Sequence, residues 1–307
     1  MKKILITGGN GFIGSNLTKL LLKSGHHVTV IDNFYSSKEN YIQYPNLSFI
    51  NHDIVNKIPD IKCDLIFHLA CPASPKVYLR DTLYTLDVNY LGTKNILDFA
   101  KHESTPIVFS STSEIYGDPE ISPQNEKYTG NVYPPSLRSS YDEGKRVAET
   151  LMYNYHINHR VPIQIVRLFN TYGPKMDPED GRVVSNFIMQ GINKEPMSIY
   201  GNGSQTRSLC YIDDITSALY KLIIKWPTYE APINLGNDKE MKIIDIADFI
   251  SESLNIEKNY IYKELPEHDP KTRKPDNSKA KELLDWEPKF SLKTGIEKTI
   301  EYFKELN

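Results

Sequence analysis

Short apolar segments alternate with segments of helical periodicity through the first half of the chain, and this alternation restricts the fold more than any other feature. Strands are predicted at residues 3–7, 27–31, 47–50, 65–69, 106–110 and 162–168, and helices at 12–23, about 81–102, and 140–158. Strands that are separated by helices form a parallel sheet covered by helices on both faces. We therefore predict an α/β fold built on a doubly wound parallel sheet.

The glycine-rich loop between the first strand and the first helix predicts a dinucleotide cofactor. Gly8, Gly11 and Gly14 form the pattern G-x-x-G-x-x-G at this junction. Glycines let the backbone turn tightly and approach a pyrophosphate, and the helix N-terminus offers free N–H groups and a positive dipole end. The pattern alone is weak evidence, but the strand before it and the helix after it indicate a Rossmann-like sheet.

Two carboxylates at strand ends refine the choice of cofactor. Asp32 ends the second strand, 18 residues after Gly14 (32 − 14), where a carboxylate accepts hydrogen bonds from the adenosine ribose and repels a 2′-phosphate. No Arg stands at residues 32–38, so NAD is favoured over NADP. Asp53 follows the third strand, and its residue type fits an acceptor for the adenine amine and the cap of a turn equally well.

Beyond Asn170 the alternation becomes irregular, which indicates a second lobe. Helical patterns return at residues 213–225, 243–254, 278–284 and 292–306. Because 213–235 should cross back onto the first lobe, we predict an NAD-binding Rossmann domain of residues 1–170 plus about 212–238. Residues 171–211 and 239–307 are predicted to form a smaller C-terminal α/β lobe that binds the substrate.

Composition and charge exclude several classes of function. The formal net charge of −3 argues against a general nucleic-acid surface, which needs a basic excess. No apolar run approaches the roughly 20 residues that span a bilayer, and the apolar start after Met1 is too short for a signal peptide. We therefore expect a cytoplasmic protein with no membrane or nucleic-acid partner. The three cysteines lack metal-ligand spacing, so no metal site is predicted.

Tyr141 and Lys145 stand four residues apart in the predicted helix 140–158, which places both side chains on one helix face. A cationic Lys beside a phenol favours the phenolate, so we expect the pKa of Tyr141 to fall toward neutral pH. Such a phenol can take a proton from a sugar hydroxyl. Thr112, in the segment STSEIYGDP, offers a second hydroxyl for that proton, and Ser113 and Glu114 follow it directly.

These motifs resemble the extended short-chain dehydrogenase/reductase family, and within it the UDP-glucuronate decarboxylases, also called UDP-xylose synthases. The resemblance covers nearly the whole chain. The strings that carry it are HLACPASP (68–75), STSEIYGDP (111–119), RSSYDEGKRVAET (138–150), RLFNTYGPKM (167–176), DGRVVSNFI (180–188), YGNGSQTRS (200–208) and RKPD (273–276). The first two are specific to this branch of the family.

The resemblance implies an NAD-dependent decarboxylation of UDP-glucuronate to UDP-xylose through a UDP-4-keto intermediate, with NAD recycled. Oxidation at C4 of a hexuronate makes a β-keto acid, which loses CO2 readily. Tyr141 is then the base, tuned by Lys145, and Thr112 bonds O4. Ser113 and Glu114 lie on the C5 side of the sugar, and Arg273 contacts the carboxylate or donates a proton.

The predicted site has three overlapping sets. The catalytic set is Thr112, Ser113, Glu114, Tyr141, Lys145 and Arg273. The cofactor set is Gly8, Gly11, Phe12, Ile13, Gly14, Asp32, Asn33, Asp53, Ile54, Leu69, Ala70, Thr112, Tyr141, Lys145 and Thr171. The substrate set is Glu114, Tyr141, Tyr155, Asn170, Arg182, Tyr200, Gln205, Arg207 and Arg273.

Other activities of the same fold are the main alternatives. A nucleotide-sugar 4,6-dehydratase also begins by oxidising C4, but it must protonate a leaving C6 hydroxyl and typically carries Asp-Glu after the Thr. This chain has Ser113-Glu114, and a C4 epimerase usually lacks the Glu. A non-catalytic NAD-binding regulator would be expected to lose Tyr141 or Lys145.

Two departures from the family pattern bear on the substrate. The segment 128–140 differs from relatives at several places near the sugar entrance, and Asp87 stands where many relatives carry Lys. An acidic residue there would weaken any hold on a carboxylate. The resemblance also implies a homodimer, formed by the helices at 81–102 and 140–158.

Overall fold

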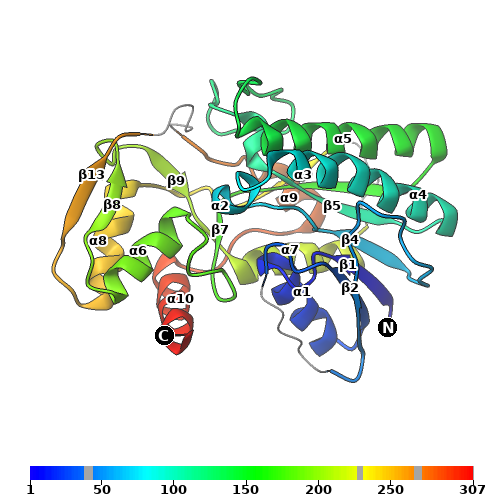
Figure 1. The fold of residues 1–307 in the computed structure, drawn as a ribbon, viewed down its shortest axis with the longest axis horizontal. Helices are drawn as coiled ribbons and strands as arrows, with labels where there is room; N and C mark the ends of the chain where they lie inside the picture. The colour runs from blue at the N-terminus through cyan, green and yellow to red at the C-terminus, as the bar shows by residue number, and fades with distance from the viewer. Residues whose placement is uncertain (38–43, 227–230, 266–271, 307) are drawn as a thin grey trace.

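The computed structural model describes residues 1–37, 44–226, 231–265 and 272–306, and a seven-stranded parallel sheet lies at its centre (Figure 1). The strand order is β11-β6-β5-β4-β1-β2-β3. These strands are β1 (Lys3–Thr7), β2 (His27–Asp32), β3 (Leu47–Asn51), β4 (Leu65–His68), β5 (Ile107–Thr112), β6 (Ile163–Leu168) and β11 (Ile233–Leu235). The predicted α/β, Rossmann-like sheet is confirmed.

The strand order reverses between β1 and β4, and this reversal locates a binding edge. From β1 the chain builds outward through β2 to β3, and then returns to place β4 on the other side of β1. Thr7 is in register with Ile31 on β2 and with His68 on β4, so the carboxyl ends of the three strands meet. Ligands of open parallel sheets bind outside such a switch point.

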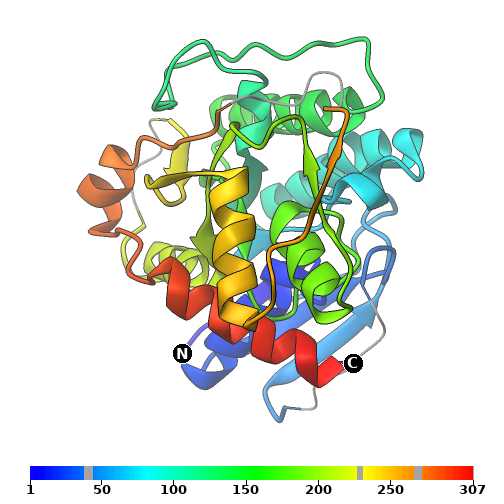
Figure 2. The ribbon, with the colours of Figure 1, turned by 90° about the vertical axis from the view of Figure 1, so that its left-hand side faces the viewer.

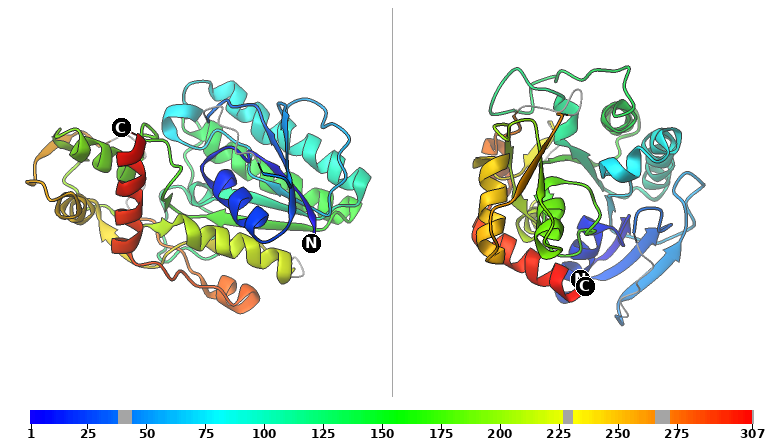
Figure 3. Two further views of the ribbon diagram at one scale, coloured as in Figure 1. Left: turned by 90° about the horizontal axis from the view of Figure 1, so that it is seen from below. Right: turned by 60° about the vertical axis from the view of Figure 1, so that its left-hand side comes forward.

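Helices cover both faces of the sheet because its strands are apolar on both sides. Ile4 and Ile6 of β1 pack in one core with α1 (Phe12–Lys23) and α7 (Ile212–Ile224). Leu5 between them packs in the opposite core with α4 (Thr93–Glu103) and α5 (Ser139–His159), as the two-residue period of a strand requires. In the left view of Figure 3, α1 and α7 lie side by side under the sheet.

The helix predicted at 81–102 is interrupted. The structure has α3 (Thr82–Asp87), a π-helical turn at Val88–Gly92, and then α4. A β-carbon at Gly92 would lie 2.7 Å from the Ile54 side chain, so the chain approaches its neighbour closely at this turn. A π-helical turn holds one residue more than an α-helical turn. The helical periodicity on both sides of it continues, so the sequence predicts one continuous helix.

The second lobe is assembled from short paired strands and three helices, seen face on in Figure 2. Its helices are α6 (Val183–Ile192), α8 (Ile243–Leu254) and α10 (Leu292–Leu306). Its paired strands are β8 (Met197–Tyr200) with β13 (Tyr260–Lys263), and β9 (Thr206–Ser208) with β12 (Glu240–Lys242). The sequence did not predict α6, although its buried residues Val184, Phe187 and Ile188 recur at helical spacing.

The junction between the lobes runs through β7 (Thr171–Tyr172) and β10 (Cys210–Tyr211), which pair in parallel. After β10 the chain crosses back: α7 packs on α1, and β11 joins the sheet beside β6. The short helix α9 (Ser278–Leu284) also packs on the first lobe, because Ala280, Leu284 and Trp286 belong to the core of α1 and α7. Assigning the whole of 239–307 to the second lobe was therefore wrong for α9.

None of the helices in the described part of the chain is long and apolar enough to cross a membrane.

The packing of α9 generates a stability prediction. Trp286 is 2% exposed, and its indole N–H donates to the Asp214 carbonyl at 3.1 Å and to Ser217 at 3.0 Å. Replacing Trp286 by Ala should lower the free energy of unfolding by about 3–5 kcal/mol, because it removes a large buried ring and leaves a cavity. Chemical denaturation measures this loss.

The chain supplies its own control in Trp226, which is 36% exposed. Trp226→Ala should change the free energy of unfolding by less than about 1 kcal/mol. Equal effects of the two substitutions would contradict a core role for Trp286.

Candidate active site

A cleft of about 1110 Å3 lies at the carboxyl edge of the sheet, between the two lobes. Residues from the loop after β1, from β2, β5 and α5, and from the second lobe line it. Every predicted site residue except Tyr155 contributes to its wall. The structure thus brings together residues from Gly8 to Arg273, although their individual roles stay predictions.

Tyr155 is the exception and does not lie in the cleft. Its hydroxyl donates to Asp98 on α4 at 2.6 Å, and its ring packs against His159. Tyr155 shares a helix stripe with Tyr141 but is 14 residues farther along (155 − 141), which is about 21 Å at 1.5 Å per residue. Periodicity specifies the face of a helix but not the position along its axis, so this substrate assignment was wrong.

The glycine loop has the close packing that a dinucleotide site needs. Gly8 has φ +70°, which favours glycine, and a β-carbon on Gly14 would lie 2.1 Å from the Gly8 carbonyl oxygen. Gly11 precedes α1 with no side-chain cap, so the first N–H groups of α1 face the cleft without a side-chain acceptor. This arrangement fits a pyrophosphate.

Asp32 ends β2 at the edge of the cleft. Its two carboxylate oxygens accept from the backbone N–H groups of Phe34 and Asn10, each at 2.9 Å. Burial raises the pKa of Asp32, and these backbone hydrogen bonds oppose the rise. The carboxylate is therefore held in place at the position where a ribose would meet it.

Asp53 accepts three hydrogen bonds at the edge of the cleft. One of its oxygens accepts from the Val55 N–H at 3.0 Å, and the other from Asn33 at 3.1 Å and from the Tyr84 hydroxyl at 2.8 Å. These bonds tie the ends of β2 and β3 to α3. The turn cap is therefore present, and because Asp53 also lines the cleft, its contact with adenine stays a prediction.

Two buried polar atoms in the cleft test whether its residues fit NAD and a nucleotide sugar. Within the described chain, Nδ2 of Asn170 and Nε2 of His52 have no hydrogen-bond partner. Both residues line the cleft, His52 beside Asp53 and Asn170 after β6. A buried donor or acceptor without a partner is costly, so these atoms fit a bound ligand with polar groups. The glycine loop, Asp32 and these atoms together fit NAD.

Tyr141 and Lys145 project from α5 toward the end of β5. Lys145 Nζ donates to the Ser110 carbonyl at 2.8 Å and lies 6.0 Å from the centre of the Tyr141 ring. The Tyr78 ring stacks on that of Tyr141, with centroids 5.1 Å apart and planes inclined by 6°. The phenol is thus held between a ring and a buried ammonium.

The expected fall in the pKa of Tyr141 does not follow from these residues. Burial raises the pKa of the Tyr141 phenol, and a hydrogen bond with Thr112 offsets only part of the rise. Burial also lowers the pKa of Lys145. The prediction from the four-residue spacing was wrong because it counted the attraction of the Lys charge and left out the cost of removing both groups from water.

Glu114 is held by two guanidinium groups. Arg273, which is 4% exposed, donates to both carboxylate oxygens of Glu114, and Arg138 donates to one of them. Burial by itself raises the pKa of Glu114, but the charges of Arg273 and Arg138 outweigh it and lower that pKa to about 2. Glu114 is therefore a carboxylate at any pH near neutrality.

Sequence reasoning missed Arg138 as a site residue. It stands three residues before Tyr141, within the string RSSYDEGK, and precedes the first turn of α5. Its position in that string was the available signal. Its partner could not be found in the same way, because Glu114 lies 24 residues earlier.

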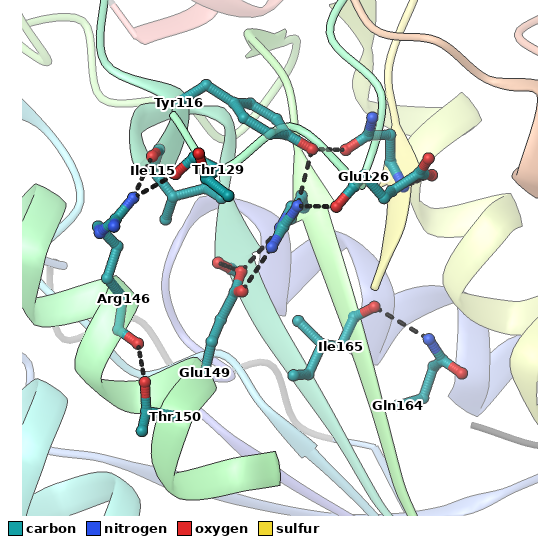
Figure 4. A network of polar contacts seen from close by, with 12 residues as sticks. Ile115, Tyr116, Glu126, Thr129, Arg146, Glu149, Thr150, Gln164 and Ile165 are labelled. Carbon is teal, nitrogen blue, oxygen red and sulfur yellow. Dashed lines mark hydrogen bonds and ion pairs between the residues drawn. The ribbon is translucent and has the colours of Figure 1, made fainter. Parts of the chain in front are cut away.

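A buried polar network fixes the segment that carries Glu114 (Figure 4). Arg167 on β6 donates to both oxygens of Glu149 on α5, at 3.0 and 2.8 Å, and to the Tyr116 hydroxyl at 2.9 Å. Tyr116 ends the 3-10 turn η2 (Ser113–Tyr116) and donates to Asn234 at 2.8 Å. The turn that bears Glu114 is therefore anchored to β6, β11 and α5 at once.

Gln124 fixes Arg273 from the other side. It is fully buried, and its side-chain oxygen accepts from the Lys274 N–H at 2.8 Å. Its backbone N–H donates to the Lys274 carbonyl, and its carbonyl accepts from the Asp276 N–H. Residues 272–277 thus form a clip with Gln124 that carries Arg273 into the cleft.

The remaining predicted arginines line the other side of the cleft. Arg182 forms an ion pair with Asp180. Burial lowers the pKa of Arg182, but the charge and hydrogen bonds of Asp180 outweigh burial and raise that pKa. Arg207 donates to the Thr206 carbonyl at 2.8 Å, and Gln205 donates to the Tyr200 carbonyl at 2.6 Å. These groups are suited to phosphate or carboxylate contacts.

Comparisons with known proteins agree with this geometry. A family model described as GDP-mannose 4,6 dehydratase matches residues 5–299. The chain is 45% identical to UDP-glucuronic acid decarboxylase 1 of Xenopus tropicalis, over 99% of this chain and 72% of that protein. It is 47% identical to UDP-glucuronic acid decarboxylase 3 of Arabidopsis thaliana, over 96% of this chain and 86% of that protein.

A solved structure shares the fold over the whole chain. UDP-glucuronic acid 4-epimerase from Bacillus cereus, in complex with UDP-glucuronic acid and NAD, superposes with a TM-score of 0.88 at 29% identity. The match covers 99% of this chain and 100% of the epimerase.

The glycine loop generates a binding prediction. Gly14→Ala should weaken NAD binding by at least about tenfold, because the added methyl group would collide with the Gly8 carbonyl and displace the loop. Titration calorimetry with NAD measures the change. Gly25→Ala is the control: Gly25 has φ +80° but no neighbouring atom within 4 Å, so stability should fall slightly while NAD affinity stays unchanged. Unaltered NAD affinity in Gly14→Ala would contradict the assigned loop.

Proposed function

The chain belongs to the UDP-glucuronic acid decarboxylases of the extended short-chain dehydrogenase/reductase family, and we propose on that premise that it converts UDP-glucuronate to UDP-xylose and CO2. It is an NAD-dependent enzyme with no net redox change. Bound NAD, held by the glycine loop and Asp32, would supply the hydride acceptor for the oxidation at C4 and the hydride donor for its reversal.

The carbon chemistry explains why a C4 oxidation precedes the loss of CO2. A ketone at C4 stands two carbons from the carboxylate carbon, so the bond from C5 to the carboxylate can break with its electrons flowing into an enolate. That enolate then needs a hydrogen-bond donor at O4 and a proton at C5. The site must therefore offer a hydrogen-bond donor to O4. It must not offer a strong acid near C6.

Tyr141 and Thr112 fit the first requirement. Tyr141 takes the O4 proton during oxidation, and its phenol then donates to the enolate oxygen together with Thr112. The group that accepts the O4 proton is the Tyr141 phenolate. Burial raises the pKa of Tyr141, so the phenolate is a strong base and the phenol formed by the transfer is a stable donor to the enolate oxygen. Lys145 provides the positive charge that limits the cost of the phenolate.

The charge state of Glu114 carries the choice among related reactions. A 4,6-dehydratase must protonate a leaving C6 hydroxyl, but the pKa of Glu114 is about 2, so it carries no proton to give. Ser113, the residue before it, is a poor acid. Arg138 and Arg273, which both donate to Glu114 and line the cleft, are the groups that we propose contact the carboxylate of a hexuronate.

We also propose a homodimer formed through α3, the π-helical turn and α5. Large apolar side chains on these elements are exposed to solvent, which is unusual for a free surface. They are Leu83, Leu86, Tyr90, Leu91, Val147, Tyr153 and Ile157. The cytoplasmic location stays a prediction.

The proposed reaction is tested by incubating the enzyme with UDP-glucuronate and a catalytic amount of NAD, followed by mass spectrometry and NMR. UDP-xylose should form without net NADH, and Tyr141→Phe should reduce turnover by at least about 10²-fold. UDP-galacturonate as the product would indicate the C4 epimerase alternative. Loss of water from UDP-glucose, with UDP-glucuronate left intact, would indicate a dehydratase.

The guanidinium pair on Glu114 generates a further expectation. Glu114→Gln and Arg273→Ala should each reduce turnover by about 10²-fold or more, because breaking a buried ion pair leaves an unmatched charge beside the substrate. NAD affinity should change by less than about twofold, since neither residue lies at the glycine loop. Glu120→Gln, an exposed carboxylate in the same segment, is the control. Normal turnover in both variants would remove the pair from the mechanism.

A further inference from the structure

The four charged side chains next to Tyr141 already cancel one another. Arg273 and Arg138 bear two positive charges, and Glu114 and Asp142 can bear two negative ones. The nearby Arg182 is matched by Asp180. If the proposed function holds, the substrate adds a further carboxylate to this neutral group, and its charge has to be balanced within the cleft.

Asp142 occupies a position from which it can respond to that charge. It follows Tyr141 in the first turn of α5, is 5% exposed, and does not form part of the cleft wall. Its Oδ2 lies 3.4 Å from Nε of Arg138, the same guanidinium that donates to Glu114. Its Oδ1 is buried without a hydrogen-bond partner in the described chain. One of its oxygens is thus poorly stabilised as an anion.

Charged and titratable side chains from four segments surround Asp142. Arg138 stands on its own helix, Glu114 on η2, Arg273 in the clip before α9, and Tyr78 on α2 (Pro75–Tyr78). Other charged side chains on the neighbouring elements are more exposed: Asp81 and Asp87 on α3, and Glu143 and Arg146 on α5. Asp142 is therefore the buried group of this cluster whose charge is least well matched.

We propose that Asp142 is a positioning residue that takes up a proton when the carboxylate of the substrate binds. When Asp142 is neutral, Arg138 has Glu114 as its one anionic neighbour in this cluster, and its positive charge can also attract the carboxylate of the substrate. Ionised Asp142 competes for the same guanidinium. The inference rests on the proposed function, because a neutral sugar would bring no charge to balance.

The electrostatics of the cluster support this role. Burial and the charge of Glu114 raise the pKa of Asp142 to about 7, against the opposing effect of Arg138 and Arg273. A second carboxylate nearby raises that pKa further. Near neutral pH, substrate binding therefore converts Asp142 from partly to fully protonated.

Proton uptake on binding is the direct test. UDP-glucuronate is titrated into the NAD-loaded Tyr141→Phe enzyme, which holds the substrate without turnover, in buffers of different ionisation enthalpy. Protons should be taken up on binding at pH 7, since Asp142 is partly ionised in the free enzyme, and the uptake should be larger at pH 8. The double variant that also carries Asp142→Asn should take up none, and UDP-glucose should cause no uptake in either protein.

Steady-state kinetics give a second measurement on the active enzyme. Above about pH 7, KM for UDP-glucuronate should rise by up to about tenfold per pH unit, while kcat changes little. In Asp142→Asn the rise in KM should disappear, because an amide cannot ionise. Glu143→Gln is the matched control: it removes the neighbouring, more exposed carboxylate of the same helix and should leave the profile unchanged.

The outcomes separate this inference from the proposed function. No release of CO2 from UDP-glucuronate by the natural chain would overturn the proposed function itself. If the natural chain releases CO2, but Tyr141→Phe and the double variant with Asp142→Asn take up equal numbers of protons, only the role of Asp142 is overturned. Loss of the pH dependence of KM in Glu143→Gln would show that Glu143, and not Asp142, takes up the proton, and it would also overturn the role of Asp142.

Discussion

The contact between Arg273 and Glu114 holds together the parts on which the site depends. The two residues are 159 positions apart, one in the clip that precedes α9 and the other in the turn after β5. Gln124 fixes the segment that bears Arg273, and the network of Arg167, Glu149 and Tyr116 fixes the turn that bears Glu114. Because both partners are braced, the ion pair is held in one geometry beside Tyr141, and the chain closes across the edge of the sheet.

Burial and charge act in opposite directions on the ionisable groups of this cleft, and the balance differs from one residue to the next. Two guanidinium groups overcome burial at Glu114 and keep it ionised, whereas at Tyr141 burial dominates and keeps the phenol protonated. Asp142 lies between these extremes. The chemistry that suits such a site is one in which an anion arrives on the substrate and leaves as a neutral molecule, as in a decarboxylation. Such a reaction needs a proton at C5 of the enolate, but it needs no strong acid to protonate a leaving hydroxyl at C6.

Much of the fold was predictable because it depends on local patterns. The strands at 3–7 and 27–31 and the helices at 12–23 and 243–254 follow from periodicity and from the glycine loop. The cofactor edge was equally accessible, since parallel strands bring Gly14, Asp32 and Thr112 to the same side of the sheet. Where prediction failed, a contact from elsewhere in the chain decided the outcome. Ala280 and Leu284, for example, pack α9 into the core of α1 and α7 of the first lobe.

The sequence by itself determined the alternation of strands and helices in the first 170 residues, the cofactor loop, and the residue types around the reacting carbons. These features depend on the spacing of residues along the chain, because local steric contacts and hydrogen bonds act between residues that are close in sequence. Only the tertiary structure decided which side chains meet and in what state of charge. Arg138 and Arg273 meet at Glu114 from positions 24 and 159 residues away in the sequence, and Tyr155 lies about 21 Å along α5 from Tyr141. A pKa depends on solvent exclusion and on neighbours in three dimensions, and neither is encoded in the distance between two residues along a helix.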